Sequence, residues 1–138
     1  MKLYTYHNQC CHDLFFEDDS KNLIDCVKKA LAKRGHLRGI DLSYKWTMND
    51  NLRGINLKGA DLTGAIFKYS DLTEANLSFC NLRHVDMRYT KLSGANLYGA
   101  TMDYMEMEET TLKDADLRET IYHKVGLTAM GQYSHKHR

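Results

Sequence analysis

The chain has 138 residues, with 19 lysines and arginines, 18 aspartates and glutamates, and no proline. This length fits one domain that buries a core without disulfide bonds. A formal net charge of +1 gives little attraction for a polyanion, so direct nucleic-acid binding and membrane association are not expected. Four cysteines, two of them adjacent, are typical of reduced thiols, which predicts a cytoplasmic protein.

The first 36 residues predict two strands and a helix. Alternating apolar residues indicate strands over 2–6 and 13–16. The helix has a suitable N-cap at Asp19 or Ser20 and is expected to end at about Arg34. Its apolar face consists of Leu23, Cys26, Val27, Ala30 and Leu31.

From residue 37 onward, a large apolar residue recurs at every fifth position. The series runs in one phase from Leu37 to Leu127, and only Thr47 is clearly unsuited to a core. A second, mostly small residue stands two positions earlier, as Ala60 does before Leu62. A period of five fits neither a helix, with about 3.6 residues per turn, nor a strand, with about two. The residues expected in the core are Leu57, Leu62, Phe67, Leu72, Leu77, Leu82, Met87, Leu92, Leu97, Met102, Met107, Leu112 and Leu117.

A period of five fits a chain that turns a corner every five residues. Four such segments make one square coil of twenty residues, and coils stack through backbone hydrogen bonds. Residues twenty apart then form columns. We expect the side chains of one such column, Asn56, Asn76 and Asn96, to bond to one another along the stack. Residues 37–127 give about four and a half coils, a rod roughly 22 Å long at ~4.8 Å per coil.

The repeats resemble the pentapeptide-repeat family, whose consensus is Ala, then Asp or Asn, then Leu and two variable residues. The best matches lie at 60–62, 75–77, 95–97 and 115–117. The resemblance implies an all-β solenoid, a right-handed quadrilateral β-helix. Because an open sheet end invites association, we expect residues 1–36 to cover the first coil as a small cap of hairpin plus helix. The family also uses homodimers that join through the C-terminal end.

One segment departs from the repeat. Lys45 and Asp50 would stand in inward slots, where burying charges without partners costs several kcal/mol. We expect residues 43–50 to bulge out of the coil, and the alternative is a poorly ordered first coil. Residues 128–138 are polar and basic and are expected to form a frayed C-terminal tail.

No pattern in the chain indicates catalysis. His7, Cys10, Cys11 and His12 lack the spacing of a zinc-finger site, and adjacent cysteines rarely both reach one tetrahedral ion. A convex rod offers no cleft in which a pair of carboxylates would be desolvated. We therefore expect a protein that is not an enzyme and that holds no metal and no cofactor.

Aromatic and basic residues on the outward positions give the strongest functional signal, because tyrosine and arginine are enriched where binding energy concentrates at protein interfaces. Lys68 and Tyr69 stand one coil before Arg88 and Tyr89, which predicts a protein-binding face. The alternative is an aromatic surface that is merely solvated. The candidate partner-binding residues are Trp46, Lys68, Tyr69, Arg88, Tyr89, Tyr98 and Tyr104.

These observations predict a non-catalytic binding protein that docks on a host or cellular protein. The lead-in over residues 13–42 resembles that of phage- and prophage-encoded members, which implies a bacterial or phage-infected host cell and a host enzyme or defence protein as partner.

The alternative function is imitation of duplex DNA, which family members direct at DNA gyrase or another DNA-binding enzyme. Residues 37–127 carry 13 acids and 11 bases, whereas a duplex ~22 Å long presents about 13 negative charges. The whole rod is therefore a poor mimic. The acids that would form a shorter mimic are Asp103, Glu106, Glu108, Glu109, Asp114, Asp116 and Glu119.

Overall fold

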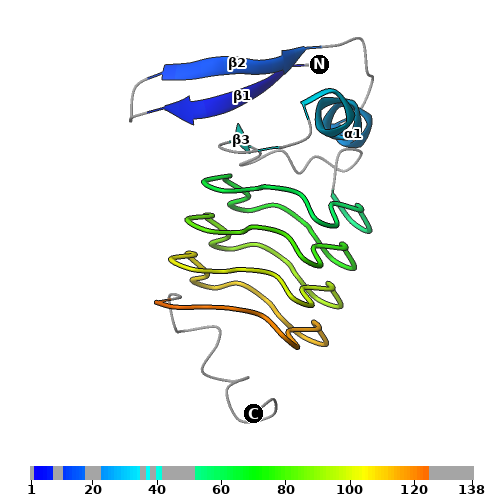
Figure 1. The fold of residues 1–138 in the computed structure, drawn as a ribbon, viewed down its shortest axis with the longest axis vertical. Coiled ribbons are helices and arrows are strands. Elements are labelled where there is room, and N and C mark those ends of the chain that lie inside the picture. The colour runs from blue at the N-terminus through cyan, green and yellow to red at the C-terminus, as the bar shows by residue number, and fades with distance from the viewer. Residues whose placement is uncertain are drawn as a thin grey trace.

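The structure is a computed structural model that describes residues 2–7, 11–17, 23–34, 37, 40–41 and 52–124. A small N-terminal unit lies at one end of a stack of coils, and the chain descends the stack toward the C-terminus (Figure 1). No helix within these segments is long and apolar enough to cross a membrane.

The N-terminal unit contains a three-stranded antiparallel sheet. Strand β1 (Lys2–His7) pairs with β2 (Cys11–Glu17), and the short strand β3 (Ile40–Asp41) pairs with the other edge of β1. The five-residue series predicts Ile40 in an inward slot of the first coil, but the structure pairs it with Thr5 of β1 instead. An apolar β-branched residue suits a strand as well as a coil, so the pattern does not distinguish the two.

Helix α1 (Leu23–Arg34) lies between β2 and β3 in the chain and at the N-terminal end of the stack (Figure 1). Three residues of the predicted apolar face, Cys26, Val27 and Ala30, are fully buried, and they belong to the same hydrophobic cluster as the coil interior. The helix begins at Leu23, and the predicted N-cap residues lie outside the described part of the chain.

Each corner of a coil is a four-residue β-turn. The N–H of Ile55 donates to the carbonyl of Leu52 at 3.1 Å, and equivalent bonds recur every five residues. The third residue of the turn has a positive φ, which glycine adopts without strain and other residues adopt at a cost. Glycine occupies only five of these positions. The other ten are Tyr69, Glu74, Phe79, His84, Tyr89, Tyr104, Glu109, Asp114, Glu119 and Lys124.

Successive coils are joined by parallel backbone hydrogen bonds. The N–H of Leu57 donates to the carbonyl of Asn76 at 2.8 Å, and the N–H of Asn76 donates to the carbonyl of Ile55 at 2.8 Å. Parallel bridges connect residues twenty apart, from Asn56 with Asn76 down to Thr101 with Ile121. Residues twenty apart therefore form columns, as the sequence predicts.

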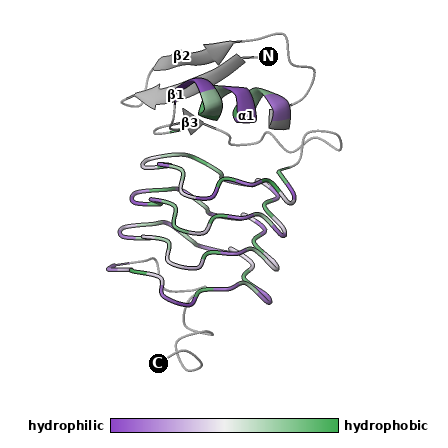
Figure 2. Cartoon of the chain, turned by 45° about the vertical axis from the view of Figure 1, so that its right-hand side comes forward, coloured by the Kyte–Doolittle hydropathy of each residue, from purple (hydrophilic) through white to green (hydrophobic). Residues whose placement is uncertain are grey.

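The interior of the stack is apolar, and Figure 2 shows hydrophobic residues recurring along every coil. All thirteen residues expected in the core, from Leu57 to Leu117, are buried. The small-residue slot is also buried from Ile55 to Thr110, and Met105 fits there without being pushed outward. Tyr122 continues the inward series in sequence but is 47 % exposed.

The register changes once between the N-terminal unit and the regular coils. The N–H of Leu37 donates to the carbonyl of Asp61, an interval five residues longer than the one from Leu57 to Asn76. One additional five-residue segment therefore lies between Leu37 and the regular coils. A whole segment of five preserves the phase, so the sequence pattern does not reveal it. The predicted bulge at 43–50 and the predicted tail at 128–138 lie outside the described residues.

The asparagine column differs from the prediction. The Oδ1 atom of Asn56 accepts from the N–H of Lys58 at 3.1 Å, and Asn76 and Asn96 make the equivalent bond two residues onward. These side chains therefore satisfy the N–H groups of their own corner turns rather than one another. An asparagine side-chain oxygen readily reaches the backbone N–H two residues onward, so each asparagine finds its hydrogen-bond donor within its own coil.

Candidate functional site

The columns divide the outer surface into four corners, each of which presents two neighbouring turn residues from every coil. The first corner comprises residues 53–54, 73–74, 93–94 and 113–114; the second 58–59, 78–79, 98–99 and 118–119; the third 63–64, 83–84, 103–104 and 123–124; the fourth 68–69, 88–89 and 108–109.

The fourth corner carries a stacked pair of tyrosines. The rings of Tyr69 and Tyr89 lie 4.9 Å apart between centroids and are tilted by 6°. Lys68 holds its Nζ atom 5.3 Å from the Tyr69 ring and 5.9 Å from the Tyr89 ring. The rings stack because adjacent coils lie ~4.8 Å apart, which is close to ring stacking distance. The result is a flat aromatic surface with a cation above it, and Tyr89 is 40 % exposed.

Arg88 belongs to the same corner but is engaged in ion pairs. Its Nη2 atom lies 2.6 Å from Oδ2 of Asp86, and its Nε atom lies 3.0 Å from Oε2 of Glu106. The hydrogen bond to Asp86 raises the pKa of Arg88 above its ordinary value, against a smaller opposing effect of burial. The guanidinium is therefore less available to a partner than the sequence suggests.

The second corner carries a chain of cations and rings. Phe79 lies directly against Gly99, where an added Cβ atom would meet the ring at 2.8 Å. The Tyr98 ring meets the Phe79 ring edge-on at 5.4 Å, and Lys58 lies 5.7 Å from the Phe79 ring. Phe79 is 55 % exposed, yet it is absent from the predicted set. The available signal was its position twenty residues before a turn glycine, which leaves space for a ring.

Arg118 ends this chain at the second corner. Its side chain lies 5.8 Å from the Tyr98 ring and pairs with Asp116 through two hydrogen bonds of 2.8 and 2.9 Å. These bonds raise the pKa of Arg118, with the Asp116 hydrogen bond as the largest cause. The charges of Arg118 and Asp116 thus compensate each other at the surface.

The third corner carries a second stacked pair, His84 and Tyr104. Their centroids are 5.1 Å apart and their planes differ by 5°. Lys124 places its Nζ atom 5.8 Å from the Tyr104 ring, which is itself half exposed.

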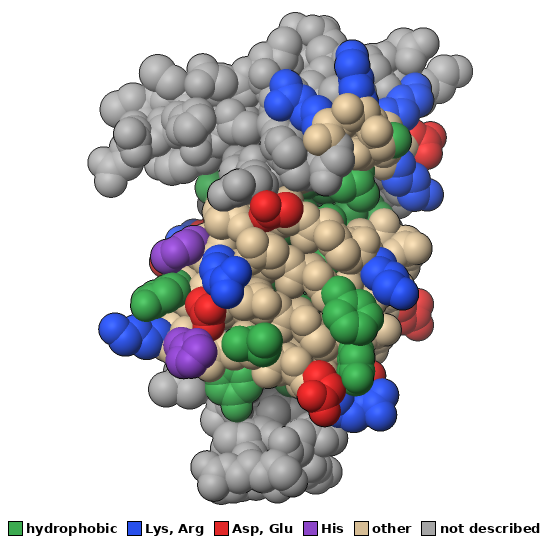
Figure 3. Space-filling model, viewed as in Figure 1, with side chains coloured by type: hydrophobic (Ala, Val, Ile, Leu, Met, Phe, Trp, Pro, Cys, Tyr) green, Lys and Arg blue, Asp and Glu red, His purple; other side chains and the backbone are tan. Residues whose placement is uncertain are grey.

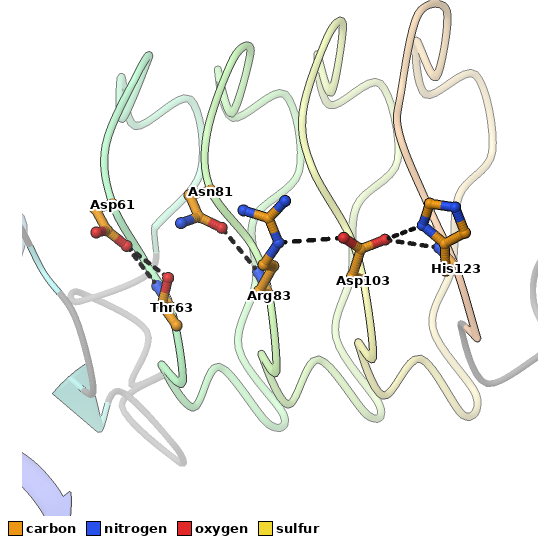
Figure 4. Close-up of polar contacts among 6 residues, drawn as sticks. All are labelled: Asp61, Thr63, Asn81, Arg83, Asp103 and His123. Carbon is orange, nitrogen blue, oxygen red and sulfur yellow. Dashed lines mark hydrogen bonds and ion pairs between the residues drawn. The ribbon is translucent and has the colours of Figure 1, made fainter.

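Beside this pair, Asp103 connects three successive coils (Figure 4). Its Oδ2 atom accepts from Nε of Arg83 at 3.1 Å. Its Oδ1 atom accepts from the backbone N–H of His123 at 2.8 Å and lies 2.8 Å from the Nδ1 atom of the same histidine. The side-chain hydrogen bond from His123 lowers the pKa of Asp103, partial burial opposes it, and the bond from Arg83 adds to the lowering.

The role of Asp103 follows from the last described residue of the neighbouring column, which runs through residues 61, 81, 101 and 121. In the coils above, Asp61 accepts from the N–H of Thr63 and Asn81 accepts from the N–H of Arg83 (Figure 4). The equivalent residue of the last described coil is Ile121, which has no side-chain acceptor. Asp103 reaches down from the previous coil and accepts from His123 instead. It is a positioning residue for the last turn.

The predicted partner-binding residues do not form one patch. Lys68, Tyr69, Arg88 and Tyr89 lie together on the fourth corner, as expected. Tyr98 lies on the second corner and Tyr104 on the third, while Trp46 lies outside the described residues.

The seven acids proposed as a DNA mimic are distributed in the same way. Asp103 is on the third corner, Glu108 and Glu109 are on the fourth, Asp114 is on the first and Glu119 is on the second. Asp103, Glu106 and Asp116 also form ion pairs with arginines of this chain. The acids surround the rod rather than lining one side of it.

The described residues offer no evident catalytic group. Cys80 is buried, its Sγ atom donates to the carbonyl of Leu57 at 2.9 Å, and burial raises the pKa of its thiol to about 11. No group of three or more potential metal ligands occurs among the residues that the structure describes. The His7, Cys10, Cys11 and His12 cluster lies where side chains are not described.

Comparison with known proteins agrees with the geometry. A profile of pentapeptide repeats matches eight copies over residues 51–78, 75–114 and 90–121. A pentapeptide repeat protein from the Arabidopsis thaliana thylakoid lumen superposes with a TM-score of 0.57 at 30% sequence identity, covering 74% of this chain and 75% of that one. A pentapeptide repeat protein from Nostoc PCC 7120 gives a TM-score of 0.56 at 21% identity, covering 77% of this chain and 90% of that one.

No protein with a curated description matches the chain. The repeat match nevertheless covers just over half of the residues, and the Arabidopsis structure shares both sequence and fold with them. The columns, the corner turns and these matches together show that the chain belongs to the pentapeptide-repeat family and folds as a right-handed quadrilateral β-helix.

Proposed function

We propose that the chain is a non-catalytic binding protein that docks on another protein through the corners of its β-helix. The observation that carries this proposal is the tyrosine stack of the fourth corner, with Lys68 over both rings. Aromatic rings held rigid by their scaffold lose little entropy on binding, and they bury a large area. No ion pair or hydrogen bond of Lys68 with a described residue competes with a partner's carboxylate for its ammonium group.

The cost of the corner conformation adds support. Tyr69 and Tyr89 have φ values of 64° and 59°, a region that bulky residues rarely adopt. Glycine would be unstrained at both positions, as it is at Gly94 and Gly99. A half-buried tyrosine and an exposed one, both in strained positions, contribute little to folding, which favours a role in recognition.

We further propose that β1, β2 and α1 cap the first coil, and that the repeats extend to about four and a half coils. Burial of Cys26, Val27 and Ala30 in the same cluster as the coil interior supports the cap. A phage-encoded origin, which the lead-in resemblance implies, would make the partner a host enzyme or defence protein.

Imitation of DNA at gyrase finds less support in the distribution of charge. A mimic needs a continuous acidic side, whereas the seven candidate acids are spread over all four corners and three of the seven pair with arginine. An assay of gyrase supercoiling with the purified protein at micromolar concentration is the direct check. Inhibition or protection there would favour mimicry over the docking function.

The docking function is tested by site-specific photo-crosslinking. A photoreactive phenylalanine in place of Tyr89 should capture a discrete partner from cells, and the same residue in place of Lys113 on the first corner should not. Capture from position 89 should be lost when Tyr69→Ala is added. Without the crosslinker, the same partner should be lost in a pull-down with the double variant that combines Tyr69→Ala and Tyr89→Ala.

The matched control is Glu74→Ala with Asp114→Ala. These residues occupy the same turn position with φ values of 60° and 58°. Both double variants therefore place alanine at two positions with the same positive-φ backbone conformation. Equal partner recovery with the tyrosine variant and the control variant would contradict the proposal.

A further inference from the structure

The third corner differs from the other three in the placement of its acid. Its one acid is Asp103, which is only 8 % exposed and whose two oxygens are occupied by Arg83 and His123. The other corners all present exposed acids, which are Glu74 and Asp114, Glu119, and Glu108 and Glu109.

The two cations of this corner, Arg83 and Lys124, face solvent and are accessible to a partner. Arg83 binds Asp103 through Nε. Its two terminal nitrogens form no hydrogen bond or ion pair with a described residue, and Figure 4 shows them directed away from the carboxylate. Lys124 lies over the Tyr104 ring and forms no ion pair with a described carboxylate. Two permanent cations and the exposed rings of His84, Tyr104 and His123 therefore face solvent with no exposed acid among them.

The shape of the corner suits an extended chain. The His84 and Tyr104 rings are parallel and lie along the rod axis, with Arg83 one coil spacing above the level of Tyr104 and Lys124 one below. Two coil spacings are about 10 Å. Alternate residues of an extended strand lie about 7 Å apart on one side, so three of them span about 14 Å. Long arginine and lysine side chains bridge the difference. In Figure 3, histidine, lysine or arginine, and hydrophobic side chains gather along one border of the face.

We propose that the third corner binds an acidic, extended segment of a partner protein. One side chain of this segment packs on the His84 and Tyr104 rings, and the carboxylates two positions before and after it, on the same side of the strand, meet Arg83 and Lys124. This inference rests on the proposed docking function and names the chemistry of the partner at one corner. Complementary charge guides encounter and fixes register, and the aromatic pair supplies buried area.

A nucleic acid is the less suitable occupant. Its phosphates repeat without interruption, and the flat faces on either side of this corner carry Asp61, Asp86 and Glu106. A continuous polyanion that covers the corner would meet these carboxylates, whereas a peptide carries its charges only where its sequence places them.

The test uses the full chain and a fluorescent nine-residue peptide with glutamate at alternate positions and a central tryptophan. Fluorescence anisotropy at about 50 mM salt, where surface charges are weakly screened, should detect binding. Arg83→Gln with Lys124→Gln should weaken that binding about tenfold. The matched control, Arg53→Gln with Lys113→Gln on the first corner, removes the same charge and should change it less than about twofold.

A peptide with lysine in place of every glutamate should not bind. Equal weakening by both charge variants would overturn the proposal, because it would show attraction to net charge alone. Absence of binding to the acidic peptide, or tighter binding of an oligothymidylate of similar charge, would overturn it as well.

Should Arg83→Gln disturb the Asp103 network and the fold, Lys124→Gln alone keeps the test decisive, because Lys124 lies over the Tyr104 ring and forms no ion pair with a described residue. Circular dichroism of each variant identifies that case. Failure of peptide binding with intact crosslinking from position 89 would remove this inference and leave the docking function standing. Loss of crosslinking specificity at position 89 would remove the docking function itself.

Discussion

The interior and the corners of this β-helix follow opposite rules. Inside, Leu62, Leu82 and Met102 stand in one column, and all are large, apolar and fully buried. At the third corner, one column runs from Gly64 through a histidine and a tyrosine to Lys124. Each coil must present the same cross-section to the next, so the interior repeats. The corner only has to accept a positive φ, so its side chains are free to differ.

This difference separates the determinants of fold from those of binding. A large-to-small substitution in the interior should lower the free energy of unfolding wherever it is made along the stack. A change at a corner should act locally, with an effect that depends on its neighbours twenty residues away.

The largest effect is expected inside. Leu82→Ala removes a fully buried side chain from the middle of the stack, so the free energy of unfolding should fall by about 3 kcal/mol. Urea denaturation followed by circular dichroism measures it. Lys113→Ala at an exposed corner position should change the same quantity by less than about 0.5 kcal/mol. Comparable losses for the two variants would contradict the division between interior and corner.

A smaller effect is expected where a corner has acquired a neighbour. Gly59 and Gly99 both have positive φ, but a Cβ atom meets nothing at Gly59 and meets the Phe79 ring at 2.8 Å at Gly99. Gly99→Ala should therefore cost about 1 kcal/mol more than Gly59→Ala.

The control is to remove the ring. In a Phe79→Ala background the two alanine substitutions should cost the same, as judged from denaturation midpoints. A difference that persists in this background would show that the ring does not lie against Gly99.

A local effect is expected at the last turn. Asp103→Ala leaves the backbone N–H of His123 without its acceptor, because Ile121 offers none. Amide exchange at His123 should accelerate. Adding Ile121→Asn should restore protection, since it supplies the acceptor that Asn81 supplies two coils earlier. Unchanged exchange in the single variant, or no rescue in the double variant, would refute this role of Asp103.

The smallest effect is expected for the loss of stability at low pH. Burial tends to raise the pKa of Asp71, but hydrogen bonds from Thr73 and the charges of Arg53 and Lys91 lower it overall, and the pKa of Asp103 is lowered too. Both groups bind protons less readily in the folded state. Their stabilising contribution is therefore complete above the ordinary value of 3.8 and is lost as the pH falls through their lower folded values.

The urea concentration at the denaturation midpoint should therefore decrease when the pH is lowered from 6 to 2.5. This decrease should be smaller in a variant with Asp71→Asn and Asp103→Asn, because that variant lacks the two carboxylates whose protonation destabilises the folded state. An equal fall in both proteins would show that other groups cause the acid sensitivity.

The periodic part of the structure was predictable from the sequence, because a column of leucines leaves its mark at every fifth residue. The five extra residues before the regular coils were not, because inserting a whole repeat unit leaves the phase intact. Ile40 was assigned to the coil for a related reason, since nothing in its type excludes pairing with β1.

The candidate surfaces were predictable only in part. The tyrosine stack follows from the spacing of Tyr69 and Tyr89, but three other features depend on contacts between coils. Arg88 is held by its neighbours, Phe79 rests on a glycine twenty residues later, and Asp103 compensates for Ile121. Such pairs carry no local sequence signature, so they become visible only when the coils are stacked.

The columns themselves underlie every surface described above, and disulfide mapping tests them most directly. Lys91 and Thr111 are bridged partners one coil apart, and coil neighbours at ~4.8 Å lie within the range of a disulfide. Lys91→Cys with Thr111→Cys should therefore give an intramolecular disulfide on mild oxidation, identified by mass spectrometry of the proteolysed chain. Asp86→Cys with Thr111→Cys, one corner out of register, should not. Efficient crosslinking of the second pair, or none of the first, would contradict the twenty-residue coil.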